Sequence, residues 1–360
     1  MSVYFQNRLD KLLNEINNLG YDGMYITNMT NIRYLTGFTG SAAILLIANE
    51  STYFLTDGRY IEQSKNEVQN AKIFIIKSNY FDTISNNKLL SQKGASIAFE
   101  GENLSFLHHQ NLIKKFSNIH WEQSNSIIET IAAVKDSKEI NALKTAIEIT
   151  DDVFTEILPE IKIGVTEKYI AAKISYLFKM KGAEGDSYES IIASGPRSAL
   201  PHARATDKEF NKGDFIVMDF GALYNGYHAD MTRTVLIGPS SPKHEEIYNI
   251  VLESQLNGIK TAKAGVPCST VDYACRSVIE EKGYGDLFTH STGHGIGLEV
   301  HTLPRIHKNN EQPLQANHVI TIEPGIYIPN WGGVRIEDDC LIASDTCIPL
   351  NKSSKELIII

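Results

Sequence analysis

Two kinds of apolar spacing alternate along the first third of the chain. Leucine and isoleucine recur at helical spacing from Leu9 to Leu19, and Gly20 follows as a stop signal, which predicts a helix. Short apolar runs between Gly, Asn, Asp and Ser predict strands near residues 23–27, 42–47, 53–56, 72–76 and 95–99, with helical stretches near 59–68 and 105–116. The alternation predicts an N-terminal α/β domain over residues 1–125, with a boundary inside 121–136.

The remaining two thirds repeat one order of elements. Asp136 or Ser137 can cap the first long amphipathic helix. The predicted order is helices at 137–158 and 166–181, strands at 190–193, 215–220 and 231–237, helices at 242–264 and 270–282, and strands at 319–322 and 333–342. Two helices followed by antiparallel strands, twice in succession, predict an α+β domain with duplicated α-β halves over residues 126–360.

Composition narrows the class of protein. The chain has 360 residues and a formal charge of −9, with 42% hydrophobic and 21% charged residues. These values exclude a disordered chain, a coiled coil and a collagen, and they disfavour a general nucleic-acid binder. No apolar run approaches the roughly 18 residues of a membrane span, and the N-terminus lacks a signal-peptide pattern. The four cysteines have no zinc or redox spacing, so we expect inert thiols in a cytoplasmic protein.

Four acids and one histidine follow strands or stand in glycine-rich turns. Asp219 ends an apolar strand, Asn225-Gly226 is a strong hairpin signal, and Asp230 lies on the return strand. The other members are His294 among three glycines, Glu323 before Pro324-Gly325, and Glu337 on a strand where Arg335 shares its face. Taken singly, each has a structural alternative: a solvated turn acid, a histidine in a glycine-rich loop, or a surface salt bridge.

Taken together, the five residues favour a cation site. Four carboxylates carry −4 and match the +4 of two divalent ions, while the imidazole stays neutral. An oxygen-rich set with one nitrogen suits Mn²⁺, Co²⁺, Fe²⁺ or Zn²⁺ better than a thiolate-rich zinc site does. Two such ions about 3.5–4 Å apart can share a hydroxide and polarise a carbonyl, which is hydrolytic chemistry.

The five residues resemble the dimetal ligand set of the pita-bread metallopeptidases, the group of methionine aminopeptidase, prolidase and aminopeptidase P. The similarity covers nearly the whole chain and is greatest to the bacterial Xaa-Pro peptidases, with their creatinase-like N-terminal domain. The further motifs that carry it are Ala193-Ser194-Gly195-Pro196, Leu200-Pro201-His202, Met231-Thr232-Arg233-Thr234, Tyr34-Leu35-Thr36-Gly37-Phe38-Thr39-Gly40 and Thr56-Asp57-Gly58-Arg59-Tyr60.

The resemblance implies a role for each site residue. Asp219 would bind one metal, His294 and Glu323 the other, and Asp230 and Glu337 would bridge both. Glu323 would also shuttle the proton. His202 and His301 would flank the substrate, and Arg335 would orient a ligand carboxylate. The family usually has an acid after the second histidine, where this chain has Thr302, and His228 is expected not to be a ligand.

The predicted activity is dimetal-dependent hydrolysis, with Mn²⁺ as the first choice of metal, of the bond preceding proline in small peptides with proline second. We favour an Xaa-Pro aminopeptidase over a dipeptidase restricted to dipeptides, because the N-terminal motifs look more like short aminopeptidase P sequences. A metal-free creatinase-like enzyme or a binding module is the distant alternative. We expect a homodimer that contacts neither nucleic acid nor membrane.

Overall fold

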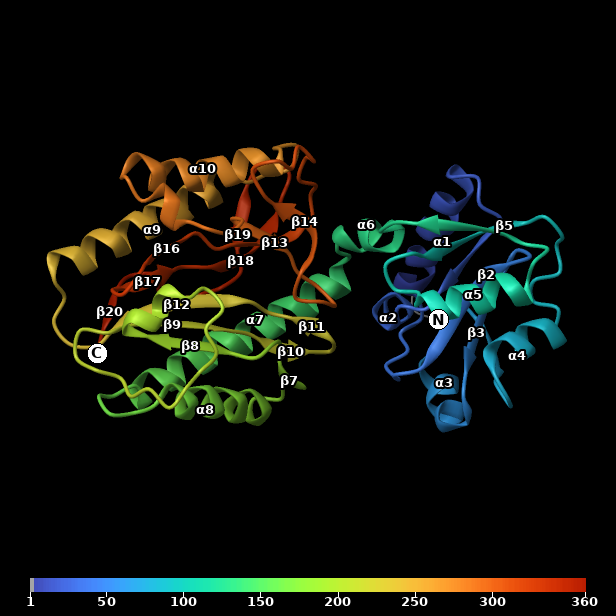
Figure 1. Cartoon of the computed structure of the whole chain (residues 1–360), viewed down its shortest axis with the longest axis horizontal. Helices are drawn as coiled ribbons and strands as arrows, with labels where there is room; N and C mark the ends of the chain where they lie inside the picture. The colour runs from blue at the N-terminus through green and yellow to red at the C-terminus, as the bar shows by residue number, and fades with distance from the viewer. Residues whose placement is uncertain (1–2) are drawn as a thin grey trace. The chain divides into compact units, whose positions relative to one another are not determined.

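The structure is a computed structural model that describes residues 3–360, and its contacts divide the chain into two compact units (Figure 1). The first extends through Ala132 and the second begins at Ala133, whereas the sequence boundary was placed at 125/126. Helix α6 (Ile127–Ala133) lies at the division. Among residues 3–360, no helix combines the length and apolar character needed to span a bilayer.

The N-terminal unit is built on one six-stranded sheet in the order β4-β3-β2-β1-β5-β6. Its strands are β1 (Gly23–Ile26), β2 (Ala43–Ala48), β3 (Ser51–Thr56), β4 (Lys72–Ile75), β5 (Ser96–Glu100) and β6 (His120–Ser124). Its helices are α1 (Val3–Asn18), α2 (Met29–Thr36), η1 (Gly58–Tyr60), α3 (Ile61–Glu67), α4 (Tyr80–Asn86) and α5 (Phe106–Lys115). The predicted α/β character of this region is confirmed.

Three elements of this unit, α2, α4 and β6, were absent from the predicted pattern. Helix α2 begins because the Asn28 side chain accepts the Thr30 N–H, and it ends at Gly37 with φ of 85°. Strand β6 is mostly exposed and joins the sheet through its parallel partner β5. These elements form through helix caps and through pairing at the sheet edge, which apolar periodicity does not reveal.

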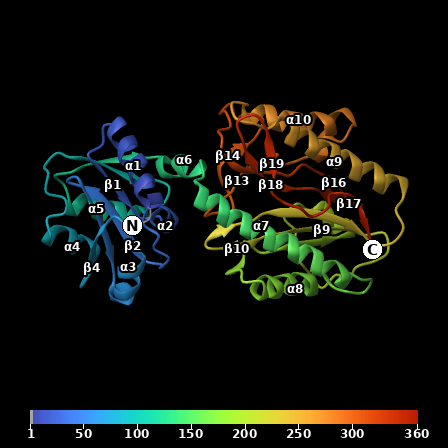
Figure 2. The same cartoon turned by 180° about the vertical axis from the view of Figure 1, so that it is seen from behind.

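Two helix pairs lie on opposite sides of the strands of the C-terminal unit (Figure 2). The first pair is α7 (Ser137–Ile157) and α8 (Glu167–Met180), and the second is α9 (Pro242–Thr261) and α10 (Cys268–Glu281). Asp136 and Glu139 form a capping box at the start of α7, which selects Asp136 from the two predicted caps. Each pair covers its own apolar cluster.

The strands of this unit form two main sheets, ordered β20-β12-β9-β8 and β14-β13-β15-β18-β19. The strands are β7 (Gly185–Asp186), β8 (Ile191–Ser194), β9 (Phe215–Phe220), β10 (Ala222–Tyr224), β11 (Tyr227–His228), β12 (Met231–Leu236), β13 (Gly293–Gly295), β14 (Thr302–Ile306), β15 (Val319–Ile322), β16 (Gly325–Ile328), β17 (Gly332–Arg335), β18 (Asp338–Ile342), β19 (Cys347–Pro349) and β20 (Ile358–Ile359). Short turns of 3₁₀ helix are η2 (Leu158–Glu160), η3 (Gly195–Ala199) and η4 (Gly285–Leu287). The predicted mixed fold with duplicated halves is confirmed.

One predicted strand is wrong, because residues 333–342 do not form a single strand. β17 pairs with β16, and β18 pairs with β15 in another sheet. The chain changes sheets at Ile336 and Glu337, which lie between the two strands. Glu337 therefore lies at a junction, and the alternation that placed it on the face of Arg335 does not hold.

Candidate metal centre

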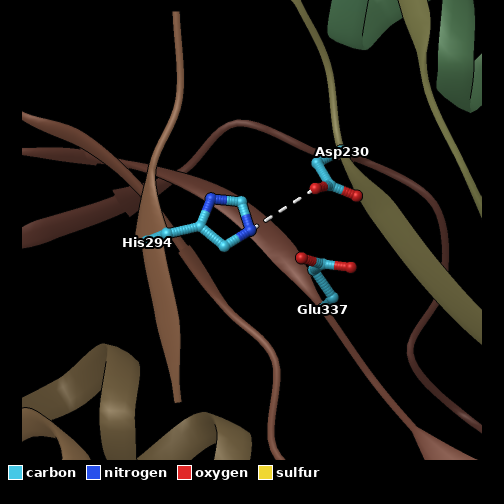
Figure 3. Close-up of side chains that lie close together, drawn as sticks. All are labelled: Asp230, His294 and Glu337. Carbon is cyan, nitrogen blue, oxygen red and sulfur yellow. Dashed lines mark ion pairs between the residues drawn. The ribbon is translucent and has the colours of Figure 1, made fainter. Parts of the chain in front are cut away.

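Asp230, His294 and Glu337 bring three metal-binding atoms within 4.8 Å of one another (Figure 3). All three residues are buried. Asp230 directly precedes β12, His294 lies on β13, and Glu337 lies between β17 and β18. Residues from both halves of the C-terminal unit thus meet at one point.

The pair of acids from the first half is positioned by antiparallel pairing and a tight turn. Thr232 on β12 is opposite Asp219 on β9. Between these strands, Asn225 and Gly226 have positive φ of 50° and 77°, as a two-residue hairpin turn requires. Gly221 is needed because a Cβ there would lie 1.7 Å from the Ala229 carbonyl oxygen. The predicted hairpin therefore places Asp219 and Asp230 on adjacent strands.

His294 is held as a neutral ligand by its backbone surroundings. A Cβ on Gly293 or Gly295 would lie 2.0 Å from a carbonyl oxygen of a neighbouring strand, so glycines are required there. The Nδ1 atom is 3.1 Å from the Gly295 carbonyl, and a carbonyl can only accept, so Nδ1 carries the proton. Burial, with the charge of His301, lowers the pKa of His294 to about 3. Nε2 therefore keeps its lone pair free, 3.4 Å from Glu323 Oε1 and 3.7 Å from Asp230 Oδ2.

The carboxylates carry more negative charge than the nearby protein compensates. Burial and then Asp219 raise the pKa of Asp230 well above its usual value. Burial, with Asp230 as the next cause, does the same for Glu337, and burial with Glu337 does so for Glu323. Among residues 3–360, Glu337 Oε1 has no hydrogen-bond partner although it is buried. Carboxylate oxygens and a neutral imidazole nitrogen fit a divalent cation, which would supply the missing positive charge.

Arg335 binds the carboxylate at the edge of this cluster. Its guanidinium donates to Asp219 Oδ2 at 2.5 Å, to the Tyr327 hydroxyl at 2.8 Å and to Thr232 Oγ1 at 2.9 Å. Thr232 also donates to Glu337 Oε2 at 2.7 Å. Arg335 therefore orients one predicted ligand directly and contacts the hydroxyl that orients a second.

Tyr188 is a site residue that the sequence interpretation missed. Its hydroxyl contacts carboxylate oxygens of both Asp219 and Asp230. Burial, followed by the charge of Asp219, raises the pKa of this phenol well above its usual value. Tyr188 lies just before β8, among residues with no apolar or acidic pattern, so no local signal distinguishes it.

His301 and His202 lie at the exposed side of the cluster. The rings of His301 and His294 are 4.4 Å apart between centroids and nearly perpendicular. His202 lies near enough to interact electrostatically with His301 and His290. Both predicted substrate-side residues are exposed.

His290, to which the sequence analysis assigns no role, is connected to the cluster by hydrogen bonds. Its Nε2 atom lies 2.8 Å from the Tyr327 hydroxyl, which accepts from Arg335. Burial, together with the Arg335 charge, lowers the pKa of His290 to about 4, so the ring is neutral. A continuous chain of hydrogen bonds thus runs from Asp219 through Arg335 and Tyr327 to His290. The position of His290 four residues before His294 was the available signal.

Two other positions fall outside the cluster. The His228 Nδ1 atom lies 2.9 Å from Ser187 Oγ, and the group of metal-binding atoms consists of Asp230, His294 and Glu337. Thr302 begins β14 opposite Gly295, and its hydroxyl donates to the Leu303 carbonyl. The unusual Thr302 is therefore accommodated locally.

Comparison with known proteins identifies both units. Residues 141–344 match the family model described as metallopeptidase family M24, and residues 8–134 match the creatinase/prolidase N-terminal domain. An Xaa-Pro dipeptidase of Pyrococcus furiosus is 39% identical over 355 residues, covering 98% of this chain and all of that protein.

Solved structures agree over the full length. An Xaa-Pro dipeptidase from Bacillus anthracis is 38% identical with a TM-score of 0.94, covering 99% of this chain and 100% of that one. An X-Pro aminopeptidase from Thermotoga maritima is 39% identical with a TM-score of 0.90, covering 98% and 99% of the two chains. These similarities concern the whole architecture, including both units.

Proposed function

This chain belongs to metallopeptidase family M24, and from that premise we propose that it is an Xaa-Pro dipeptidase. The enzyme hydrolyses the peptide bond before proline and releases the two amino acids. The observation that carries the proposal is a buried cluster of carboxylates around Glu337 whose negative charge the nearby protein does not balance. It lies in a chain that matches Xaa-Pro dipeptidases along its whole length. The dipeptidase, our second choice from the sequence, takes precedence because relatives and solved structures with that name recur.

Five residues would hold two divalent cations, with Mn²⁺ as the first metal to test and Co²⁺, Fe²⁺ and Zn²⁺ after it. Asp219 and His294 would each bind one ion, Glu323 would share the ion of His294, and Asp230 and Glu337 would bridge. When bound, the cations supply Lewis-acid activation of water and of the scissile carbonyl. The raised pKa values of Asp230, Glu323 and Glu337 express the same need for positive charge.

The protein groups then orient the substrate and move the proton. Glu323 accepts a proton from the attacking water and delivers it to the proline nitrogen. His202 and His301 flank the dipeptide at the exposed side of the cluster. Arg335 orients the Asp219 carboxylate through their 2.5 Å ion pair.

Proline needs a dedicated site because its nitrogen has no hydrogen in a peptide and its ring fixes φ near about −65°. A peptidase that relies on that N–H or on an extended chain loses both contacts. A site that activates the scissile carbonyl needs neither contact, and uncharged rings such as that of His290 lie beside it.

The test is to remove metal, add back Mn²⁺, and compare Ala-Pro, Ala-Pro-Ala and Ala-Ala-Ala as substrates. Cleavage of Ala-Pro alone supports the dipeptidase. A matched Glu337→Gln variant, purified identically, must lose the activity, which excludes a contaminating peptidase. Failure to cleave any Xaa-Pro peptide with two metals bound would overturn the proposal.

An Xaa-Pro aminopeptidase is the second candidate, since an X-Pro aminopeptidase structure matches the chain with a TM-score of 0.90. Cleavage of Ala-Pro-Ala at its first bond in the same experiment would establish it. The homodimer stays a prediction, which light scattering of the purified protein tests.

A further inference from the structure

A buried glutamate outside the metal cluster holds the chain segment that carries His202. We propose that Glu167 is a positioning residue: it fixes both ends of residues 195–205, so that His202 is presented to the substrate. This inference rests on the proposed function. The segment defined by residues 195–205 is called the His202 arm below.

Glu167 binds both ends of the His202 arm. Its Oε1 atom accepts from the backbone N–H and the hydroxyl of Ser194, each at 2.9 Å. Its Oε2 atom accepts from the Thr206 backbone N–H at 3.0 Å and from the Thr206 hydroxyl at 2.8 Å. Ser194 and Thr206 flank the arm and form its base, so one carboxylate holds the two ends of the arm together.

The same carboxylate reaches into the arm through Arg197. The Arg197 Nε atom lies 3.1 Å from Glu167 Oε2, and its NH2 atom donates to the Arg204 carbonyl at 2.6 Å. Arg197 therefore connects Glu167 to the outgoing side of the arm, two residues after His202. These hydrogen bonds link the two sides of the arm to each other.

The arm also contacts the site strands, because η3 (Gly195–Ala199) packs against β17, which carries Arg335. Arg335 donates to the Pro201 carbonyl at 3.3 Å, and the Gly333 N–H donates to Ser198 Oγ at 2.8 Å. The His202 side chain itself is exposed. Its direction is set by the backbone on either side, which is held by these contacts on one side of the arm and by Glu167 at its two ends.

Only an ionised carboxylate can make all these bonds. Glu167 is completely buried, and every partner at its two oxygens is a donor. A glutamine keeps the shape but replaces one accepting oxygen with an N–H₂ group, which cannot accept and faces donors. One end of the arm would then lose its attachment and be left with unpaired buried groups.

The first experiment measures local exchange without using activity. In hydrogen–deuterium exchange of the metal-loaded protein, Glu167→Gln should speed exchange across residues 194–206 and leave the strands of the metal cluster unchanged. Glu139→Gln is the matched control, because Glu139 is another buried glutamate that caps α7 and bonds Tyr227 instead. Unchanged exchange in the His202 arm would overturn the proposal.

The second experiment is a double-mutant cycle with His202. Glu167→Gln should lower kcat for Ala-Pro by about 10- to 100-fold, the size of effect that a displaced catalytic group produces, with two metals still bound. In a His202→Ala background, Glu167→Gln should have little further effect on kcat. Equal effects in both backgrounds would mean that Glu167 does not act through His202 and would overturn the proposal.

A milder variant covers the case in which Glu167→Gln does not fold. Thr206→Val keeps the side-chain shape and removes the hydroxyl, with its bond to Glu167 and the one it accepts from the Lys208 N–H, so it should show the same local exchange and coupling at smaller size. Wild-type protein that cleaves no Xaa-Pro peptide would refute the proposed function, whereas the exchange experiment would still decide whether Glu167 holds the arm.

Discussion

Glu337 and Asp338 are consecutive acids, both about 1% exposed, yet they belong to opposite kinds of buried cluster. Glu337 lies among Asp219, Asp230 and Glu323, and its pKa is raised by burial and by Asp230. Burial alone would also raise the pKa of Asp338, but the charges of Arg233 and Lys355 lower it below its usual value. The pKa values of two adjacent buried carboxyl groups are thus shifted in opposite directions.

The Asp338 cluster is complete within the protein. Arg233 and Lys355 each donate to Asp338 at 2.7 Å, and Gln255 donates at 3.0 Å. Arg233 also donates to the Glu337 carbonyl at 2.5 Å and to the Ser353 carbonyl at 3.0 Å. This cluster anchors the C-terminal residues and the backbone of the neighbouring ligand.

The clusters around Glu337 and Asp338 differ in whether the protein itself balances the buried negative charge. Removing one partner from a buried charge that the chain itself compensates destabilises the fold, whereas a buried charge without partners costs stability unless something else binds. Proteins break the rule of satisfied polar groups mainly at functional sites. The uncompensated charge around Glu337 agrees with the metal site proposed there, and the cluster around Asp338 has all its partners within the protein.

The largest effect is expected for Glu337→Gln. Because it removes a bridging carboxylate, kcat/KM should fall by about 10³-fold or more, equivalent to roughly 4 kcal/mol of transition-state stabilisation. The metal-free variant should be as stable as wild type or more so, since an uncompensated charge is gone. Steady-state kinetics, metal analysis and denaturation of metal-free protein check this, and near-normal turnover would refute the metal assignment.

Asp338→Asn should lower the stability of the fold rather than the activity of the folded protein. It leaves the buried Arg233 and the partly exposed Lys355 without their counter-charge, so the free energy of unfolding should fall by about 3–5 kcal/mol. The fraction that stays folded should keep its metal and its turnover. Urea denaturation gives the first quantity, and a stable but inactive variant would contradict the comparison.

The stabilising effect of metal should depend on pH. The pKa values of Asp230, Glu323 and Glu337 are raised in the folded state, so the folded metal-free protein binds more protons than the unfolded chain. Its stability therefore falls as pH rises through those raised values. Bound metal at about 100 times its Kd adds roughly 2.7 kcal/mol.

We accordingly expect the difference in Tm between metal-loaded and metal-free protein to widen as pH rises from about 5 to about 8. Scanning calorimetry at fixed free metal measures it. The Asp338→Asn variant is the control, since it should keep this pH dependence, and a difference that narrows with rising pH would contradict the assignment.

The smallest effect is expected for Tyr188→Phe. Loss of the hydroxyl that contacts Asp219 and Asp230 should weaken metal binding by about 10-fold, the lower end of the range for residues that orient ligands. Titration calorimetry with Mn²⁺ measures the affinity. Tyr224→Phe, whose ring packs against an apolar cluster, should bind metal normally.

The elements with strong local signals could be predicted from the sequence. Helix α7 has its apolar periodicity and the capping box at Asp136, and the β10–β11 hairpin has Asn225-Gly226. Candidate site residues could be named from the sequence where they stood in glycine-rich or strand-end motifs, as Asp219, Asp230 and His294 do. Tyr188 and Glu167 could not, because their partners are distant in the sequence and nothing local marks them.

The sequence by itself determined the two-part α-β architecture, the family resemblance and the five candidate ligands, because periodicity, caps and motifs are local properties. Only the tertiary structure decided which acids are compensated. Glu337 and Asp338 are indistinguishable as neighbours in the chain, and they differ because the change of sheets between β17 and β18 turns one toward other carboxylates and the other toward Arg233 and Lys355. Burial and charge pairing depend on contacts between distant segments, and these exist only once the chain has folded.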